Sequence, residues 1–552
     1  MNVHDAAGHG GRAARPRTRV RVRAMLTLAT AASTTLVLLP QATDSVAAVG
    51  ALGVGTDFNA DGYADLAVGI PNERLGSGQR GGAVQVLYGS SSGLNAFGSQ
   101  LWSQNSPGID GSAEDGDGFG LSVATGDFNG DGFTDLAASA ESEDFIAGLE
   151  NDGVVHVIYG SPSGLTSAGS QMWSQDNAGI PGLGESGDHF GSSLAAGDID
   201  GDDRDELLIA AAGEDSSAGS VTVIYGTSAG LNPTGSQMWT LDSPGIPGDA
   251  EQSHSFGTGM AVGDFDGDLD GDLAVSWETT VPAGRCCFAD GGGRVTVLLG
   301  TPDGITTSGA QVWSQSSAGI AGEPEPGDGF GRAMVTGDLD GSGQDELIVG
   351  ARGDNPAAGG GGSVTVIKGS PAGLTGIGSQ QWAPGSPGLD RGEYTAEFGR
   401  SLAVGQFGGT KDLDLAIGAT EAQVSSIGDA GGVYVLIGSP SGLATAGNQF
   451  WSQDSPGIAD QVEHFGLVDG EKFGQVVVGG NYDGSGFTDL AIGVKNEDVG
   501  VNEGEGDNQG AAHVIYGGRA ALSADGNQFW MQGLDGLPGS AEEADVFSSD
   551  MG

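Results

Sequence analysis

Residues 119–140 read FGLSVATGDFNGDGFTDLAASA, and the nine residues at 127–135, DFNGDGFTD, decide the fold. The same nine-residue pattern returns six more times along the chain. The copies are DFNADGYAD at Asp57, DIDGDDRDE at Asp198, DFDGDLDGD at Asp264, DLDGSGQDE at Asp338, QFGGTKDLD at Gln406 and NYDGSGFTD at Asn481. Their starts lie 70, 71, 66, 74, 68 and 75 residues apart. Spacing this regular indicates one structural unit per copy.

Two further markers give the same count of units. A tryptophan recurs at Trp102, Trp173, Trp239, Trp313, Trp382, Trp451 and Trp530. A Phe-Gly pair precedes the loop at Phe119, Phe190, Phe256, Phe330, Phe398 and Phe473. The units therefore start near residues 49, 119, 190, 256, 330, 398 and 473.

Each unit reads as four short strands separated by Gly, Asp, Ser and Pro. In the third unit the strands are FGSSLAAGD, ELLIAAA, SVTVIYG and SQMWTLD, and no helical periodicity follows residue 48. About 70 residues of glycine-rich chain are too few for an independent core, which argues against a linear array of domains. We predict an all-β fold, a seven-bladed β-propeller of four-stranded antiparallel blades.

How the ring closes is left open by the sequence. Val49-Gly50 takes the Phe-Gly position of the first unit, so the first blade can begin with its own inner strand. The C-terminal DVFSSDMG resembles the start of the third unit, so the tail at residues 531–552 is an alternative closure strand.

The nine-residue loops have oxygen-bearing side chains at positions 1, 3, 5 and 9 and a backbone carbonyl at position 7, which suits Ca²⁺. In the best copies the acids crowd like charges that need a counter-ion, so a merely polar turn is the weaker interpretation. The EF-hand glutamate at position 12 is missing. The predicted metal-binding residues are Asp57, Asn59, Asp61, Tyr63, Asp65, Asp127, Asn129, Asp131, Phe133, Asp135, Asp198, Asp200, Asp202, Arg204, Glu206, Asp264, Asp266, Asp268, Asp270, Asp272, Asp338, Asp340, Ser342, Gln344, Glu346, Asn481, Asp483, Ser485, Phe487 and Asp489.

The copies differ in quality as calcium loops. Ser342 and Ser485 replace acids at position 5 of the fifth and seventh loops, which should weaken binding there. The sixth loop has Gln406, Gly408 and Thr410 where the other copies have acids. We predict five or six Ca²⁺ ions and none in the sixth loop.

The N-terminus has the layout of a secretory signal peptide. An arginine-rich block at residues 12–23 is followed by an apolar run to about Pro40 and by small residues at Val46-Ala47-Ala48. Residues 1–48 are the predicted signal peptide and residues 49–552 the propeller, secreted to the extracellular space. With 73 acidic against 20 basic residues the formal charge is −53, which disfavours nucleic acid as a partner.

The repeat resembles the FG-GAP repeat of integrin α-subunit propellers and their bacterial secreted relatives, most clearly in residues 119–140. The resemblance covers residues 49–552 and implies a seven-bladed propeller with Ca²⁺ in hairpin loops on one face. It restricts function much less, because the repeat also occurs in lectin-like proteins and beside the catalytic domain of a glycosylphosphatidylinositol-specific phospholipase.

The face opposite the loops is the predicted recognition surface, because its connections are long and variable. Four features there have both a functional and a structural interpretation. Trp277 would stack on a sugar or line its own loop. Cys286-Cys287 would form a strained vicinal disulfide, stay as free thiols or link to another chain. Arg352-Gly353-Asp354 is an integrin-ligand tripeptide or a coincidence, and acidic inserts occupy residues 141–152 and 495–507.

These features favour a non-catalytic propeller that binds extracellular protein or carbohydrate ligands in an adhesion-like role. GSSSG at Gly89 and GTSAG at Gly226 match a nucleophile motif, but sister units have proline in the same turn. The alternative is a secreted hydrolase or lyase, directed at glycans or phospholipids, that uses the propeller as its scaffold. The oligomeric state is not predicted.

Overall fold

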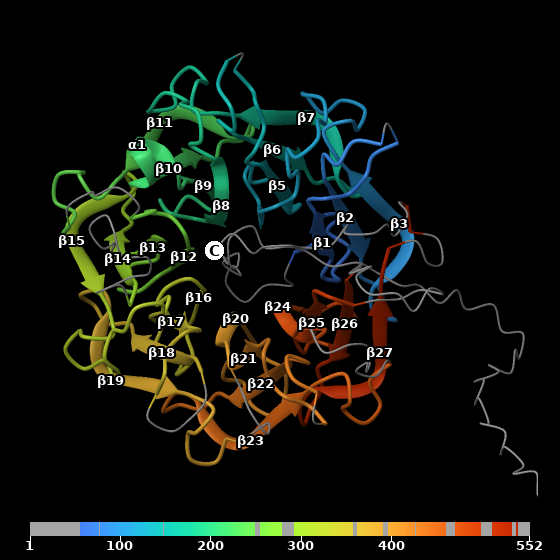
Figure 1. Cartoon of the computed structure of the whole chain (residues 1–552), viewed down its shortest axis with the longest axis vertical. Helices are drawn as coiled ribbons and strands as arrows, with labels where there is room; N and C mark the ends of the chain where they lie inside the picture. The colour runs from blue at the N-terminus through green and yellow to red at the C-terminus, as the bar shows by residue number, and fades with distance from the viewer. Residues whose placement is uncertain are drawn as a thin grey trace, which may run out of the picture. The chain divides into compact units, whose positions relative to one another are not determined.

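The structure is a computed structural model that describes residues 56–76, 78–146, 148–248, 254–278, 292–356, 361–389, 396–425, 427–459, 470–497, 510–532 and 537–538. Apart from one helical turn, α1 (Glu214–Ser217), the regular elements there are strands. The strands form seven antiparallel sheets, each made of consecutive strands. Figure 1 shows these sheets as blades around a common axis, which confirms the predicted seven-bladed β-propeller.

The first three blades occupy the first half of the chain. Blade one contains β1 (Leu66–Ile70), β2 (Ala83–Tyr88) and β3 (Asn95–Trp102). Blade two contains β4 (Val123–Gly126), β5 (Asp135–Ala140), β6 (Val154–Tyr159) and β7 (Thr166–Trp173), and blade three contains β8 (Phe190–Gly197), β9 (Glu206–Ala211), β10 (Ser220–Tyr225) and β11 (Asn232–Trp239). The inner strand expected at Val49-Gly50 lies outside the described residues, so blade one is described with three strands.

The other four blades each have four strands. Blade four contains β12 (Met260–Gly263), β13 (Asp272–Trp277), β14 (Arg294–Leu299) and β15 (Thr306–Trp313), and blade five contains β16 (Met334–Gly337), β17 (Glu346–Ala351), β18 (Ser363–Lys368) and β19 (Thr375–Trp382). Blade six contains β20 (Phe398–Gly405), β21 (Asp414–Ala419), β22 (Gly432–Ile437) and β23 (Ala444–Trp451), and blade seven contains β24 (Phe473–Gly480), β25 (Asp489–Val494), β26 (Ala511–Tyr516) and β27 (Ser523–Trp530).

The two middle strands of each blade form its core. β5 and β6 are buried along their whole length, whereas the outermost strand β7 is half-buried with an exposed centre. In every blade the register shifts once between the third and fourth strands, as between Val157 and Tyr159 in blade two. This irregularity is a β-bulge, which redirects the side chain that follows it.

The Phe-Gly pair joins neighbouring blades. Phe119 is fully buried, and it bridges to Gly82 of the preceding blade. Gly120 has φ +83°, and a Cβ there would lie 2.7 Å from the carbonyl oxygen of Ala83. The pair therefore places an aromatic ring in the core and lets two blade backbones approach closely.

The repeated tryptophans also belong to the core, as the sequence favours. Trp173 and Trp530 are buried. The other five are half-buried against clusters of buried aliphatic side chains: Trp102, Trp239, Trp313, Trp382 and Trp451.

Each blade also reaches the next through a glutamine on its outermost strand. In all seven cases the side-chain Nε2 donates to a backbone carbonyl in the following blade. The pairs are Gln100–Leu165, Gln171–Leu231, Gln237–Ile305, Gln311–Leu374, Gln380–Leu443, Gln449–Leu522 and Gln528–Leu94. The last pair joins blade seven to blade one, so non-covalent contacts close the ring among the described residues. Of the tail at 531–552, the alternative closure strand, residues 533–536 and 539–552 lie outside them, including the DVFSSDMG segment.

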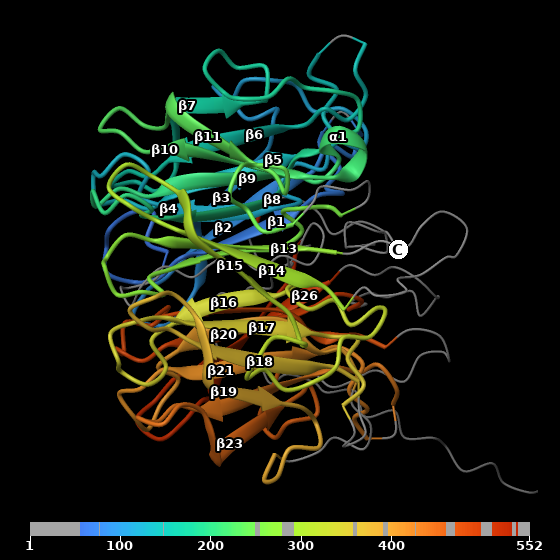
Figure 2. The same ribbon diagram turned by 90° about the vertical axis from the view of Figure 1, so that its left-hand side faces the viewer.

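Because strands alternate in direction, the first and third connections of each blade lie at one face and the second and fourth at the other. The nine-residue loops are first connections. α1 belongs to the second connection of blade three and lies on the right-hand side of the ribbon in Figure 2. The repeated loops and the variable connections are thus on opposite faces, as predicted.

Candidate metal centres

Position 1 of each loop organises the turn. In blade two, Asp127 Oδ1 accepts from the backbone N–H of Asp131 at 3.1 Å, and its Oδ2 accepts from the N–H of Gly132 at 2.8 Å. The same contacts recur around Asp57, Asp198, Asp264 and Asp338. The loop backbone therefore wraps around one carboxylate and brings positions 3 and 5 toward it.

Position 9 has a role that the sequence did not reveal. Asp135 is fully buried; its Oδ2 accepts from the N–H of Phe128 at 3.0 Å, and its Oδ1 accepts from the N–H of Gly160 at 2.8 Å. One carboxylate thus joins the loop to the third connection of the same blade. Corresponding pairs of bonds are made by Asp65, Glu206, Asp272, Asp414 and Asp489.

Burial of the position-9 carboxyls raises their pKa. The pKa rises to about 8 for Asp65, Asp135 and Glu206, and to about 7 for Asp272 and Asp489. Backbone N–H groups lower these values but do not offset the desolvation. In the absence of a cation, the folded state therefore favours the protonated form.

This shift predicts how the stability of the metal-free protein depends on pH. A carboxyl whose pKa is higher in the folded than in the unfolded state stabilises the fold below about pH 4, and that contribution is lost as the pH rises toward about 8. In EDTA we expect Tm to fall on the order of 5–10 °C between pH 5 and 8.5. Thermal scans across this range provide the test, and a Tm that rises with pH in EDTA would contradict the assignment.

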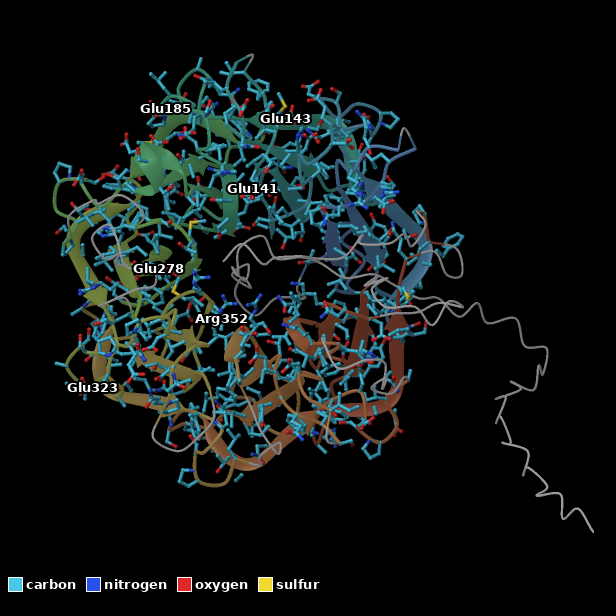
Figure 3. The ribbon with its side chains drawn as sticks, in the orientation of Figure 1. Glu141, Glu143, Glu185, Glu278, Glu323 and Arg352 are labelled. Carbon is cyan, nitrogen blue, oxygen red and sulfur yellow. The ribbon has the colours of Figure 1, made fainter. Side chains whose placement is uncertain are left out.

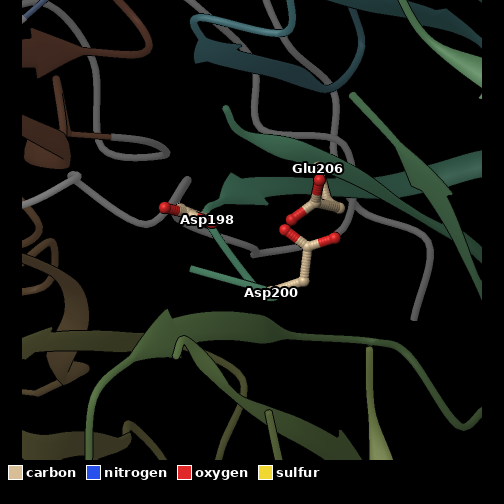
Figure 4. A group of neighbouring side chains, drawn as sticks. All are labelled: Asp198, Asp200 and Glu206. Carbon is tan, nitrogen blue, oxygen red and sulfur yellow. The ribbon is translucent and has the colours of Figure 1, made fainter. Parts of the chain in front are cut away.

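Three loops bring carboxylates together closely enough to hold a cation. Within each group the ligand oxygens lie within 4.8 Å of one another. The groups are Asp198, Asp200 and Glu206; Asp264, Asp266 and Asp272; and Asp338, Asp340 and Glu346. Figure 4 shows the first group, in which the carboxylates of Asp200 and Glu206 face each other.

The donor sets of the third and fourth loops fit a hard divalent cation. Asp200 Oδ1 and Asp266 Oδ1 are buried and have no hydrogen-bond partner. Burial, followed by the neighbouring aspartates, raises the pKa of both residues. Buried oxygens without a partner are costly, and a bound cation would satisfy them.

The remaining loops use amides or lose the acids. In loop one, Asn59 Oδ1 accepts from the N–H of Asp61 at 2.8 Å, and in loop seven Asn481 Oδ1 accepts from the N–H of Gly486 at 3.3 Å. In loop six, Gln406 Nε2 donates to the carbonyl of Lys411. Loop six nevertheless keeps its position-9 acid, Asp414, which is fully buried.

Position 7 was predicted to offer a backbone carbonyl, and its side chain also contacts the preceding loop. A Cβ at Gly130, which has φ +69°, would lie 2.9 Å from Arg204 Cγ, and one at Gly201 would meet Asp270 Oδ1. Arg204 also forms an ion pair with Asp202 at position 5 of its own loop. In these loops glycine at position 4 is favoured by its positive φ and because the neighbouring loop packs on it.

On the opposite face, Trp277 lines its loop and does not form an exposed platform. Its side chain is buried, its Nε1 donates to Thr296 Oγ1 at 3.0 Å, and its ring contacts that of His254. The neighbouring Glu278, labelled in Figure 3, forms an ion pair with Arg332 at 2.5 Å. The structural interpretation of Trp277 is therefore confirmed, and Cys286-Cys287 lies outside the described residues.

The Arg-Gly-Asp tripeptide is built into the fold. Asp354 is buried and accepts from Ser363 Oγ at 2.5 Å, while the N–H of Gly353 donates to the carbonyl of Asp328 at 3.0 Å. Arg352 Nη1 lies 3.8 Å from Glu397 Oε1. A buried aspartate cannot present this tripeptide to a receptor, so these contacts favour coincidence.

Sequence analysis missed a carboxyl pair on the same face. The carboxyls of Asp117 and Glu143 lie close enough to influence each other, and burial raises the pKa of both. Gln104 Nε2 donates to Glu143 Oε2 at 2.6 Å, and Figure 3 labels Glu143 on this face. Asp117 and Glu143 are 26 residues apart and lie in two different connections, so no spacing motif in the sequence links them. Only the fold brings them together.

Helices long and apolar enough to cross a membrane are absent from the described part of the chain. The FG-GAP repeat matches residues 48–87, 119–158 and 190–224. The chain is 36% identical to integrin alpha-7 of Rattus norvegicus over 157 residues, which are 28% of this chain and 12% of the integrin. It is 32% identical to integrin alpha-PS2 of Drosophila melanogaster over 242 residues, 42% of this chain and 15% of the integrin.

A third relative is an enzyme. The chain is 33% identical to phosphatidylinositol-glycan-specific phospholipase D of Mus musculus over 153 residues, 28% of this chain and 17% of that protein. The chain thus covers less than a fifth of each of these three relatives. What it shares with them is the repeat and the blades built from it. The chain therefore carries FG-GAP repeats within an integrin-like β-propeller.

Proposed function

We propose that this chain is a secreted, calcium-binding propeller that binds extracellular protein or carbohydrate ligands in an adhesion-like role. The observation that supports calcium most directly is the convergence of loop carboxylates around buried oxygens without hydrogen-bond partners in the third and fourth loops. Similarity to integrin α-subunits supports an extracellular binding role. Residues 1–48 would be removed on export.

The side chains at positions 1, 3, 5 and 9, with the carbonyl at position 7, would hold the ions. When bound, Ca²⁺ supplies positive charge that neutralises these carboxylates. The loops then hold the turns of neighbouring blades rigidly, because in six of the seven loops the position-1 carbonyl accepts an N–H from the following loop, as Asp127 does from Asp205 at 3.1 Å. A rigid face of this kind would support ligand-binding connections on the opposite face.

The binding role is tested with the exported form, residues 49–552, on arrays of glycans and extracellular matrix proteins. We expect saturable binding in Ca²⁺ that falls at least about tenfold in EDTA, because loss of the ions loosens the scaffold. A heat-unfolded sample serves as the control for nonspecific retention by so acidic a chain. Absence of binding to every glycan and protein would contradict the proposal.

A hydrolase is the second candidate, favoured by the Asp117–Glu143 pair and by similarity to a phospholipase D. A carboxyl with a raised pKa beside a second carboxyl is an arrangement used for acid–base catalysis. Product release from polysaccharides or phospholipids, lost in Glu143→Gln, would support this role. Ligand binding without turnover would support the adhesion-like role instead.

A further inference from the structure

Lys368 interrupts a repeated pattern at the end of the third strand in each blade. This position follows the β-bulge. The residues there are Tyr88, Tyr159, Tyr225, Leu299, Lys368, Ile437 and Tyr516. The tyrosine hydroxyls donate to a glutamine of their own blade, as Tyr88 does to Gln100 at 2.6 Å. Blade five alone has a cation at this position.

The ammonium of Lys368 lies in the acidic group of the fifth loop. Its Nζ is 2.8 Å from Asp340 Oδ2 and 3.6 Å from Glu346 Oε1. The Lys368 and Glu346 side chains are 13% and 1% exposed. Asp340 and Glu346 occupy loop positions 3 and 9, so the amine lies between two of the three carboxylates that could hold a metal in this loop.

Comparison with the third and fourth loops shows what the lysine changes. Their position-3 aspartates, Asp200 and Asp266, each keep a buried oxygen without a partner. Asp340 instead accepts the Lys368 hydrogen bond, while Glu346 Oε1, 3.6 Å from the Lys368 Nζ, is buried without a hydrogen-bond partner.

The arginine in the third loop does not do the same. Arg204 pairs with Asp202 at position 5, and its side chain is 31% exposed. Asp200 and Glu206 remain available beside it in the acidic group. The position of the cation therefore matters: Lys368 lies close to both the position-3 and the position-9 carboxylate, whereas the carboxylate that Arg204 pairs with is Asp202 at position 5.

We propose that the Lys368 ammonium is the resident cation of the fifth loop and takes the place that Ca²⁺ takes in the other acidic loops. An ammonium carries positive charge and has no lone pair, so it can neutralise nearby carboxylates but cannot ligate a metal. A divalent ion beside it would be repelled. Ser342, which replaces an acid at position 5, further lowers the negative charge of the loop. This inference rests on the proposed calcium binding and reduces the expected ions from five or six to five.

The test is the number of Ca²⁺ ions bound per chain, measured by metal analysis after equilibrium dialysis. Lys368→Leu should bind one ion more than the wild type, because Leu299 shows that leucine is accommodated at this position. Lys411→Leu is the matched control, since the sixth loop lacks the acids and should gain none. Glu346→Gln in the Lys368→Leu background should remove the gained ion.

A second readout is stability without calcium. In EDTA, Lys368→Leu should melt roughly 3–5 °C below the wild type, because the carboxylates lose their counter-ion, and millimolar Ca²⁺ should restore the difference. If the wild type binds Ca²⁺ but Lys368→Leu binds no additional ion, the inference about Lys368 is overturned while the proposed calcium binding stands. Wild-type protein that binds no ion would overturn the proposed calcium binding as well.

If Lys368→Leu does not fold, anomalous scattering from wild-type crystals grown in Ca²⁺ decides the matter. Density in the third and fourth loops with none in the fifth supports the lysine as resident cation. Density beside Asp340 and Glu346 overturns it.

Discussion

Excess EDTA is expected to lower the Tm of this protein on the order of 15 °C or more relative to the protein in millimolar Ca²⁺. A site held at about 100 times its Kd contributes about 2.7 kcal/mol of stability, since only the folded state binds. Five such sites would contribute about 13 kcal/mol. For a chain of this size each kcal/mol corresponds to roughly 1–2 °C, which gives the expected fall.

The structural reason for so large an effect is the number of close carboxylates. Without ions, the groups Asp198–Asp200–Glu206 and Asp264–Asp266–Asp272 must hold like charges within 4.8 Å or take up protons. Differential scanning fluorimetry in Ca²⁺, in EDTA and after adding Ca²⁺ back measures the effect. Mg²⁺ serves as the control cation, because its stricter octahedral geometry suits these loops less. Equal melting in Ca²⁺ and EDTA would rule out calcium as a structural ion.

Asp414→Ala is expected to destabilise the protein by about 3 kcal/mol, equally in Ca²⁺ and in EDTA. Asp414 Oδ2 accepts from the N–H of Gly408 at 3.3 Å, and Oδ1 accepts from the N–H of Gly438 at 2.9 Å. Both glycines are buried, so removal of the carboxylate leaves two donors unsatisfied, at about 1–3 kcal/mol each. The effect is independent of calcium because the sixth loop lacks the other acids.

Two variants make this measurement specific. Gln406→Ala, at position 1 of the same loop, removes only an exposed bond to Lys411 and should change stability by less than about 0.5 kcal/mol. Asp414→Asn keeps one carbonyl acceptor and should be intermediate. Urea unfolding in both buffers gives the values, and a loss for Asp414→Ala that appears only in Ca²⁺ would mean that the sixth loop does bind a metal.

The double role of the position-9 carboxylate explains why part of the site was not predicted from the sequence. Spacing alone identifies Asp135 as a carboxylate facing the loop. Its second role depends on Gly160, 25 residues away, whose N–H reaches the same carboxylate only after the blade has formed. The retention of Asp414 in the sixth loop was the available signal, because an acid kept where the other ligands are lost has another function.

Lys368 and Asp354 show the same limit of sequence analysis for residues whose functional role was in question. Lys368 lies 28 residues beyond Asp340, and only the folded blade brings its amine to the fifth loop. Asp354 reads as part of an exposed tripeptide, but Ser363 across the second connection holds it in the interior. In both cases the neighbour comes from another strand.

The sequence by itself determined the number of blades, their strands and the position of the acidic loops, because these follow from a repeat whose members interact within one blade. Only the tertiary structure showed that blade seven contacts blade one, since Gln528 reaches Leu94 across 434 residues. It also decided which loop carboxylates already have a partner. Contacts between blades depend on side chains that lie far apart in the chain. Which hydrogen bonds and ion pairs such a side chain forms depends on the residue that the neighbouring blade presents to it.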